Sequence, residues 1–209
     1  MNLKRYNVFI FLLTAILLGI GLMACSSTAR LPRLASDAVV VAFGDSITFG
    51  TGANPEESYP AVLEKLIERR VVNAGVPGEV TADGLSRLPE ILEREKPALL
   101  ILCHGGNDLL RHLNEQQTAD NIRSMIRLAT QRGVAVVLIA VPFPGILVSP
   151  APMYRDIAKE LTIPLEEETL SSVLADGSLK SDLIHPNAAG YRRLAEALAA
   201  LLKKSGAID

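Results

Sequence analysis

Short apolar runs alternate with stretches of helical periodicity over most of this chain, and that alternation restricts the fold more than any other feature. The apolar runs end in turn residues and are expected as buried strands at residues 39–43, 71–72, 98–103 and 134–141. Helical spacing of apolar residues occurs at residues 59–69, 85–95, 118–131 and 188–203. Parallel neighbours need crossover connections, so this order predicts an α/β fold: a mostly parallel sheet with helices on both faces.

The first 24 residues are typical of an export signal rather than of a folded domain. Lys4 and Arg5 precede an almost wholly apolar stretch at residues 8–22. That stretch suits the core of a signal peptide but is shorter than the roughly 20 apolar residues that a membrane-spanning helix needs. We therefore expect a signal peptide at residues 1–24.

The end of this segment, Leu22-Met23-Ala24-Cys25, resembles the lipobox of bacterial lipoproteins. The resemblance implies that the Cys25 thiol is acylated and that Cys25 becomes the new amino terminus. It also implies a bacterial cell-envelope protein that is anchored to a membrane by lipid and faces the periplasm. Ser26, in place of an aspartate, favours the outer membrane. The alternative is an ordinary signal peptide with an incidental cysteine.

The remainder of the chain is expected to form a tether and one domain. Residues 25–37 are Ser-rich, contain Pro32 and lack an apolar period, which indicates a tether. The domain is then expected at residues 38–209, a length of about 170 residues that suits a single core. We expect a monomer or a weak oligomer.

Charge and cysteine content exclude several classes of protein. The net charge is −2 and Lys and Arg form no dense cluster, so a nucleic-acid partner is not expected. Only two cysteines occur, and a lipid on Cys25 would leave Cys103 without an intramolecular partner. No disulfide is therefore expected in the processed protein.

Ser46 is the first candidate for chemistry, because residues 44–48 (GDSIT) directly follow the first expected strand. Ligands of open parallel sheets collect at the carboxyl ends of the strands, and Ser46 belongs at such an end. A free hydroxyl is a weak nucleophile, so it needs a base within hydrogen-bond reach and a third group that orients the base. The alternative is that Ser46 only caps a following helix or forms part of a polar turn.

Few residues can act as the base, because the chain has only three histidines: His104, His112 and His185. His185 lies just before the last expected helix, and Asp182 is three residues upstream. In a tight turn this carboxylate can hold the imidazole in the tautomer that presents its free nitrogen to Ser46. The alternative is that Asp182 is only a turn residue and His185 a bystander.

Two glycine-containing turns can supply donors for an oxyanion. Residues 73–78 (NAGVPG) follow the second expected strand, and there Gly78 is the best candidate to point a backbone N–H at a ligand. Residues 105–108 (GGND) follow the third, and the side-chain amide of Asn107 can donate without titrating. Loop glycines and an Asx-type turn at Asn107 are the alternatives.

Together these turns resemble the sequence blocks of the SGNH hydrolases, also called the GDSL esterase family. Residues 44–47 (GDSI) match the first block with Ile47 where leucine is usual, and residues 73–78, 105–108 and 182–186 resemble the others in order. The resemblance covers nearly all of the chain after Ser36. Two departures are Pro77, where serine is usual in the bacterial thioesterase and arylesterase members, and Glu79-Val80 in place of their Asp-Thr.

The resemblance implies a fold, a set of roles and a reaction. The fold is a three-layer α/β/α sandwich, similar to flavodoxin, with a sheet of about five strands. Ser46 is then the nucleophile, His185 the base and Asp182 its partner. The backbone N–H groups of Ser46 and Gly78 and the side chain of Asn107 bind the oxyanion. No metal and no organic cofactor is expected.

Three other functions compete with this interpretation. A metal-dependent phosphoesterase could use Asp45, Asn107, Asp108 and histidines as ligands, but the chain lacks the Asp-x-His or paired-histidine ligand set of such sites. His104, Asp108 and His112 have the spacing of one helix face, but the glycines at residues 105–106 would break that helix. A cysteine hydrolase using Cys103 and His104 is disfavoured, because adjacent residues in a strand point to opposite faces. Cys103 is instead expected in the core. A catalytically inactive lipoprotein that binds lipid or glycan is the third.

The substrate is the least constrained property. The sequence predicts a serine esterase of the thioesterase, arylesterase or lysophospholipase type that cleaves a carboxylic ester or thioester through an acyl-enzyme. Residues 143–148 (FPGILV) are apolar and follow the fourth expected strand, so we expect them to wall a pocket for a medium or long acyl chain. A buried loop that only seals the core, and an O-acetyl esterase acting on envelope polysaccharide, are the alternatives.

Overall fold

The computed structural model describes residues 29–145 and 148–209, and its centre is a parallel sheet of five strands. The strands lie in the order β2-β1-β3-β4-β5. Their bounds are Val40–Gly44 for β1, Val71–Gly75 for β2, Leu99–Cys103 for β3, Ala135–Ile139 for β4 and Leu165–Glu166 for β5. The predicted α/β fold with a mostly parallel sheet of about five strands is confirmed.

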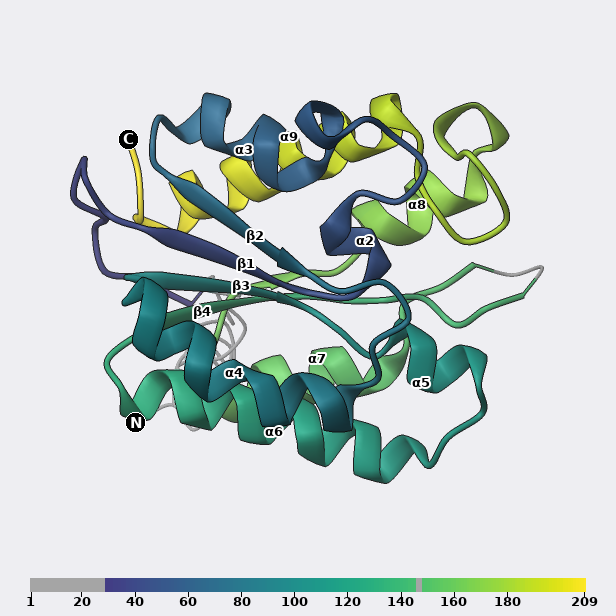
Figure 1. The fold of residues 1–209 in the computed structure, drawn as a ribbon, viewed down its shortest axis with the longest axis horizontal. Coiled ribbons are helices and arrows are strands. Elements are labelled where there is room, and N and C mark those ends of the chain that lie inside the picture. Colours follow the sequence, from purple (N-terminus) through teal and green to yellow (C-terminus); the bar gives the residue numbers. More distant parts are fainter. Residues whose placement is uncertain (1–28, 146–147) are drawn as a thin grey trace, which may run out of the picture.

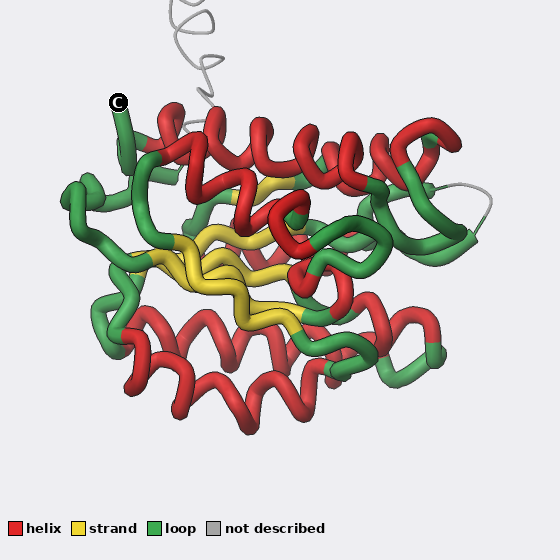
Figure 2. The backbone as a smooth tube through the Cα atoms, turned by 45° about the horizontal axis from the view of Figure 1, so that its top comes forward, coloured by secondary structure: helices red, strands yellow, loops and turns green. Residues whose placement is uncertain are grey.

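Helices cover both faces of the sheet and complete three layers (Figures 1 and 2). One face carries α2 (Ser46–Phe49), α3 (Tyr59–Ile67), α8 (Thr169–Ala175) and α9 (Ala188–Ser205). The other carries α4 (Thr81–Glu95), α5 (Gly106–Leu110), α6 (Glu115–Gln131) and α7 (Pro152–Leu161). Two short 3₁₀ helices, Pro55–Glu57 and Gly177–Leu179, lie in connections.

The central strands explain why the sequence shows continuous apolar runs instead of alternation. Every residue of β1 and of β3 is buried, and the two strands pair in register from Val40 with Leu99 to Gly44 with Cys103. A strand covered on both faces has no solvent side for polar residues. Its carboxyl end is therefore the first point at which polar side chains can reach a ligand.

The structure differs from the sequence prediction mainly in short or early-starting elements. β5, α7 and α8 were not predicted, and β5 has only two residues, too few to produce a periodic pattern. Helix α4 begins at Thr81, four residues before the predicted start at residue 85. A residue outside the helix stabilises its first turn, because the backbone N–H of Thr81 donates to the carboxylate of Asp108 at 2.9 Å.

Part of the stretch expected as a tether is already attached to the domain. The N–H of Leu31 donates to the carbonyl of Ser205, and the N–H of Leu34 to that of Ala207, each at 2.9 Å. Leu34 is also buried. These contacts lie at the carboxyl end of α9, where Figure 1 places the C terminus. The predicted signal peptide and Cys25 lie outside the described residues.

Across residues 29–145 and 148–209, none of the helices is both long enough and apolar enough to cross a membrane.

Candidate active site

Ser46 is the first residue of α2, and only Asp45 separates it from the end of the strand β1. Asp45, not Ser46, caps this helix: its Oδ1 accepts the N–H of Ile47 at 3.1 Å. Burial raises the pKa of Asp45, although the neighbouring His104 and His185 rings and the N–H of Ile47 act in the opposite direction. With Asp45 buried beneath the turn, the hydroxyl of Ser46 is left at the carboxyl edge of the sheet.

His185 lies beside Ser46 although 139 residues separate the two in the sequence. Its Nε2 is 3.0 Å from Ser46 Oγ, and its Nδ1 is 2.8 Å from Asp182 Oδ2. The other carboxylate oxygen of Asp182 accepts the backbone N–H groups of Ile184 and His185, each at 2.8 Å. The carboxylate therefore fixes both the imidazole and the turn that carries it.

These contacts assign the tautomer of His185. A carboxylate can only accept, so Nδ1 carries the proton and Nε2 is free to take the proton of Ser46. Partial burial would raise the pKa of Asp182, but hydrogen bonds from the His185 ring and from two backbone N–H groups outweigh it and lower that pKa. Asp182 thus stays ionised and can stabilise an imidazolium.

The two predicted oxyanion turns lie next to each other. Gly78 follows β2 with φ +81°, a conformation that favours glycine, and its carbonyl accepts a hydrogen bond from Arg111 at 2.8 Å. Asn107 lies in α5, and its Nδ2 donates to the carbonyl of Glu79 at 3.0 Å. An amide nitrogen has two N–H bonds, so this contact leaves one for a ligand.

Asp108 attaches the second turn to the start of α4. Its carboxylate accepts the N–H of Thr81 at 2.9 Å, the hydroxyl of Thr81 at 2.6 Å and the hydroxyl of Thr118 at 3.3 Å. Asn121 donates to the Thr81 hydroxyl at 3.0 Å. Asp108 is buried and its contacts come from α4 and α6, so its role here is to join these helices to α5.

A cavity of about 630 Å³ opens beside Ser46, Asn107 and His185, which all line it. Most of its wall is apolar, and the residues that form that part of the wall are Ile47, Leu110, Val141, Pro142, Phe143, Pro144, Val148, Leu170, Leu174, Ala175, Leu183 and Ile184. The loop expected to wall an acyl pocket thus contributes Phe143, Pro144, Gly145 and Val148; residues 146 and 147 of that loop lie outside the described residues. Volume and lining suit a small-molecule site.

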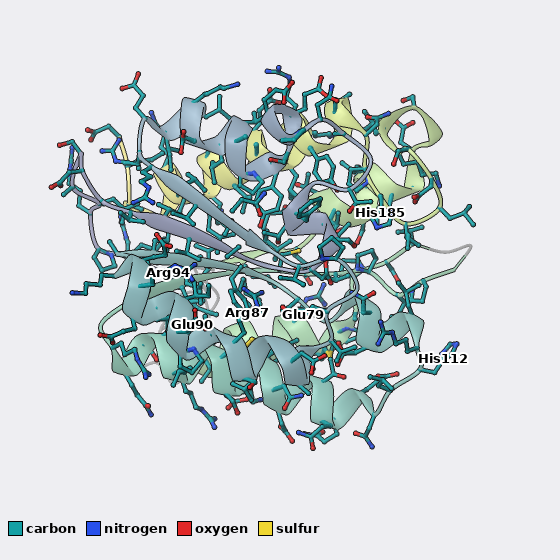
Figure 3. All side chains as sticks on the ribbon, in the orientation of Figure 1. Glu79, Arg87, Glu90, Arg94, His112 and His185 are labelled. Carbon is teal, nitrogen blue, oxygen red and sulfur yellow. The ribbon has the colours of Figure 1, made fainter. Side chains whose placement is uncertain are left out.

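The other two histidines and Cys103 do not join Ser46. His112 follows α5 with φ +53° and points outward, far from His185 in Figure 3. His104 and Cys103 are fully buried, and burial raises the pKa of the Cys103 thiol, which disfavours a thiolate nucleophile. Within residues 29–145 and 148–209, no three His, Cys, Asp or Glu side chains are grouped as metal ligands.

Sequence reasoning missed one wall of the cavity and one buried cluster. Leu170 and Leu174 of α8 line the cavity, and their spacing of four was the only signal in a helix too short to be predicted. Glu79 lies against Arg87 and His104 behind the oxyanion turns, and Figure 3 shows Glu79 and Arg87 side by side between the sheet and α4. The departure at residues 79–80 from the usual Asp-Thr marked this position without indicating its contacts.

Comparison with known proteins agrees with this geometry. The sequence profile of the GDSL-like Lipase/Acylhydrolase family matches residues 42–193. Esterase TesA of Pseudomonas aeruginosa is 32% identical over 188 residues, which cover 84% of this chain and 92% of that protein. Thioesterase 1/protease 1/lysophospholipase L1 of Escherichia coli K12 is 29% identical over 163 residues, covering 74% of this chain and 78% of the other.

Solved structures lead to the same family. The crystal structure of TesA superposes with a TM-score of 0.72 at 31% identity and covers 80% of this chain and 99% of its own. AlinE4, described as an SGNH-hydrolase family esterase, superposes with a TM-score of 0.63 at 31% identity, covering 82% and 98%. The profile spans both Ser46 and His185. This chain therefore belongs to the GDSL-like lipase/acylhydrolase family of SGNH hydrolases and is an ester-hydrolysing enzyme of that family.

Proposed function

We propose that this enzyme hydrolyses carboxylic ester or thioester bonds through an acyl-enzyme formed on Ser46, with His185 as general base and Asp182 as its orienting partner. The observation that carries the proposal is the unbroken line of contacts from Ser46 Oγ to His185 Nε2 at 3.0 Å and from His185 Nδ1 to Asp182 Oδ2 at 2.8 Å. Both distances lie within the range required for proton transfer.

The reaction follows from the positions of these atoms. Ser46 Oγ attacks the acyl carbon while its proton passes to His185 Nε2, and the charged Asp182 stabilises the imidazolium. The tetrahedral intermediate then expels the alcohol or thiol, which takes the proton from His185 and leaves an acyl ester on Ser46. Water attacks that ester, gives its proton to His185 and releases the acid, and the proton returns to Ser46.

The developing oxyanion needs donors that are already in place. As the first residue of a helix, Ser46 has an N–H without a helical partner. Asn107 lines the cavity with Ser46, and one amide hydrogen is free. The N–H of Gly78, in the turn that Asn107 binds, is the third proposed donor. Fixed donors of this kind act where charge appears in the transition state.

The proposed substrate is an ester or thioester of a medium or long acyl chain. The apolar wall of the cavity supports this, because burial of each methylene group contributes about 0.8 kcal/mol. The names of the relatives, an esterase and a thioesterase/lysophospholipase, are consistent with such a substrate. A series of nitrophenyl esters tests the idea: kcat/KM should rise from acetate to octanoate. Best turnover on acetate would instead favour an O-acetyl esterase.

The lipobox resemblance supports a lipid anchor on Cys25 in the bacterial envelope. Leu31 is held at the carboxyl end of α9, whereas His185 lies just before its start, and 18 residues of helix span about 27 Å. Six residues from Cys25 to Leu31 reach at most about 20 Å. A lipid on Cys25 would therefore attach near the end of α9 that lies away from His185 and the cavity. Labelling with a fatty-acid analogue, lost in Cys25→Ser, tests the anchor.

Covalent labelling is the most direct test of the enzymatic proposal. A fluorophosphonate should modify the native protein at Ser46 and inactivate it in step with labelling. Ser46→Ala should abolish both turnover and labelling, while its thermal unfolding midpoint stays close to that of the native protein. Labelling that persists in Ser46→Ala would refute the assignment of the nucleophile. A native protein that is neither labelled nor active would leave an inactive lipid- or glycan-binding protein as the better interpretation.

A further inference from the structure

The buried cluster behind the oxyanion turns contains one carboxylate with three charged or polar contacts. Arg87 Nε donates to Glu79 Oε1 at 2.8 Å and Arg87 Nη2 to Oε2 at 2.7 Å, a two-pronged ion pair. His104 Nε2 lies 3.1 Å from the same Oε2. Side-chain exposure is 7% for Glu79 and 0% for His104, so solvent screens these contacts only weakly.

The contacts of His104 define its protonation. Its Nδ1 accepts the N–H of Gly105 at 3.0 Å, so that nitrogen carries no proton. Nε2 then carries the proton and donates it to Glu79. His104 is thus a neutral bridge from the Glu79 carboxylate to the backbone at the start of α5, the helix that carries Asn107.

These bonds close a ring that joins both oxyanion turns. The Glu79 carboxylate accepts from His104, and the ring of His104 accepts from Gly105, which precedes Asn107 by two residues. The Asn107 amide in turn donates to the carbonyl of Glu79 at 3.0 Å. Every bond of the ring therefore fixes the distance between the Gly78–Glu79 turn and the Asn107 side chain.

The surroundings keep this ring of hydrogen bonds in one position. Gly84 of α4 packs against the imidazole so closely that a Cβ there would lie 2.4 Å from His104 Nε2. Tyr154 donates to the carbonyl of His104 at 2.7 Å. Arg87 also donates to the carbonyl of Ala74 at 3.1 Å and lies 4.2 Å above the Phe43 ring. The helices α4 and α7 and the strands β1 and β2 thus all support the cluster.

Arg87 has an electrostatic consequence as well. A lone carboxylate next to the donor turn would oppose the negative charge that develops on the substrate oxygen. The paired guanidinium neutralises it, and a preorganised site can then stabilise the oxyanion fully. An ion pair whose only task was to attach α4 to the sheet would not need its carboxylate to come from the neighbour of Gly78 and to contact His104, the residue preceding the Asn107 turn.

We propose that Glu79, Arg87 and His104 are positioning residues for the proposed oxyanion site, holding the Asn107 amide and the Gly78 turn at a fixed separation while the tetrahedral intermediate forms. None of the three lines the cavity, so they act through Asn107 and the turn. The inference rests on the proposed function, because the reaction must pass through an oxyanion at this place.

The first test is the kinetics of His104→Leu on nitrophenyl butyrate. This variant is similar in size but removes both hydrogen bonds of the His104 imidazole. We expect kcat to fall about ten- to a hundredfold, as misplacement by about 1 Å would cause, and KM to change little. His104→Gln keeps an amide donor towards Glu79 and should recover part of kcat. A fall in activity that appears only in KM would overturn the proposal.

The decisive test is a double-mutant cycle with Asn107→Ala. If His104 acts through Asn107, adding His104→Leu to Asn107→Ala should slow the enzyme by no more than about threefold further, although it is costly in the native background. Multiplication of the two single effects would overturn the proposal. If His104→Leu does not fold, Arg87→Met enters the same cycle, because it removes the ion pair and keeps the aliphatic length.

Two controls separate this inference from loss of stability and from failure of the proposed function. Leu198→Ala creates a cavity in α9, remote from the ring, and should lower the unfolding midpoint without changing kcat. Ser46→Ala tests the proposed function itself. If Ser46→Ala is inactive while His104→Leu has normal kcat, only the positioning role is refuted.

Discussion

The two halves of the site are built in opposite ways. On the His185 side, the Asp182 side chain is 52% exposed and is held by contacts within its own turn. On the donor side, Glu79 is 7% and His104 0% exposed, and contacts come from β1, β2, α4 and α5. Local contacts suffice to hold Asp182 and His185 together, whereas the donors depend on the packing of several elements. Mutations on the His185 side should therefore lower kcat with little change in stability, whereas mutations on the donor side should lower both.

The largest effect should come from the exposed half. Asp182→Asn presents an amide to Nδ1 of His185 and favours the wrong tautomer, so we expect kcat to fall about 10³- to 10⁴-fold. The unfolding midpoint should change little, because the side chain is half exposed. Steady-state kinetics and thermal unfolding of the same preparation check both statements. A large loss of stability would contradict the contrast between the halves.

Asn107→Ala should have the next largest effect. Removing one oxyanion donor costs about 10²- to 10³-fold in kcat, because the interaction strengthens as the charge forms. KM should be nearly unchanged. The Asn107 bond to the Glu79 carbonyl is lost as well, so this variant should also unfold at a somewhat lower temperature than Asp182→Asn. A change confined to KM would contradict the role of donor.

The difference between the halves also explains what could be predicted from the sequence. Asp182 and His185 are three residues apart and Ser46 directly follows a strand, so local order and the rule that sites lie at strand ends were sufficient to place the proton-transfer residues. The parallel sheet followed from the same alternation. Both predictions use information carried by short segments.

The ring behind the donors could not be found in that way. Glu79, Arg87 and His104 come from three segments, and their meeting depends on how α4 packs on the sheet. Gly84 would be predicted to weaken a helix, yet it is needed because His104 occupies the space of a side chain there. The wall from α8 was missed for a similar reason, since tertiary contacts hold a seven-residue helix with little pattern of its own.

Gly84→Ala sharpens the comparison at this point. An alanine normally favours a helix by about 1 kcal/mol over glycine, but here its Cβ would collide with His104. We expect a net destabilisation of about 1 to 3 kcal/mol, as for other overpacked sites, and a roughly tenfold lower kcat. Denaturant unfolding and nitrophenyl ester kinetics measure the two quantities. A stabilised variant with normal kcat would show that the ring tolerates displacement.

The smallest expected effect concerns stability at acid pH and comes from the titration of Glu79. Burial alone would raise the pKa of this carboxyl, but hydrogen bonds from His104 and Arg87 and the charge of Arg87 lower it to about 2. A lowered pKa in the folded state contributes stability above the ordinary value of 4.5, and that contribution is lost as the pH falls towards 2. The gap corresponds to about 3 kcal/mol of unfolding free energy at most.

Glu79→Gln cannot titrate, so its unfolding free energy should fall less steeply than that of the native protein between pH 4.5 and 2. Glu90→Gln is the matched control, because Glu90 lies on the same helix as Arg87, is 78% exposed and pairs with Arg94 at 3.4 Å (Figure 3). An exposed pair of this kind contributes little. The control should therefore follow the native curve, and if Glu79→Gln follows it too, the carboxylate is not the charge that the buried half of the site depends on.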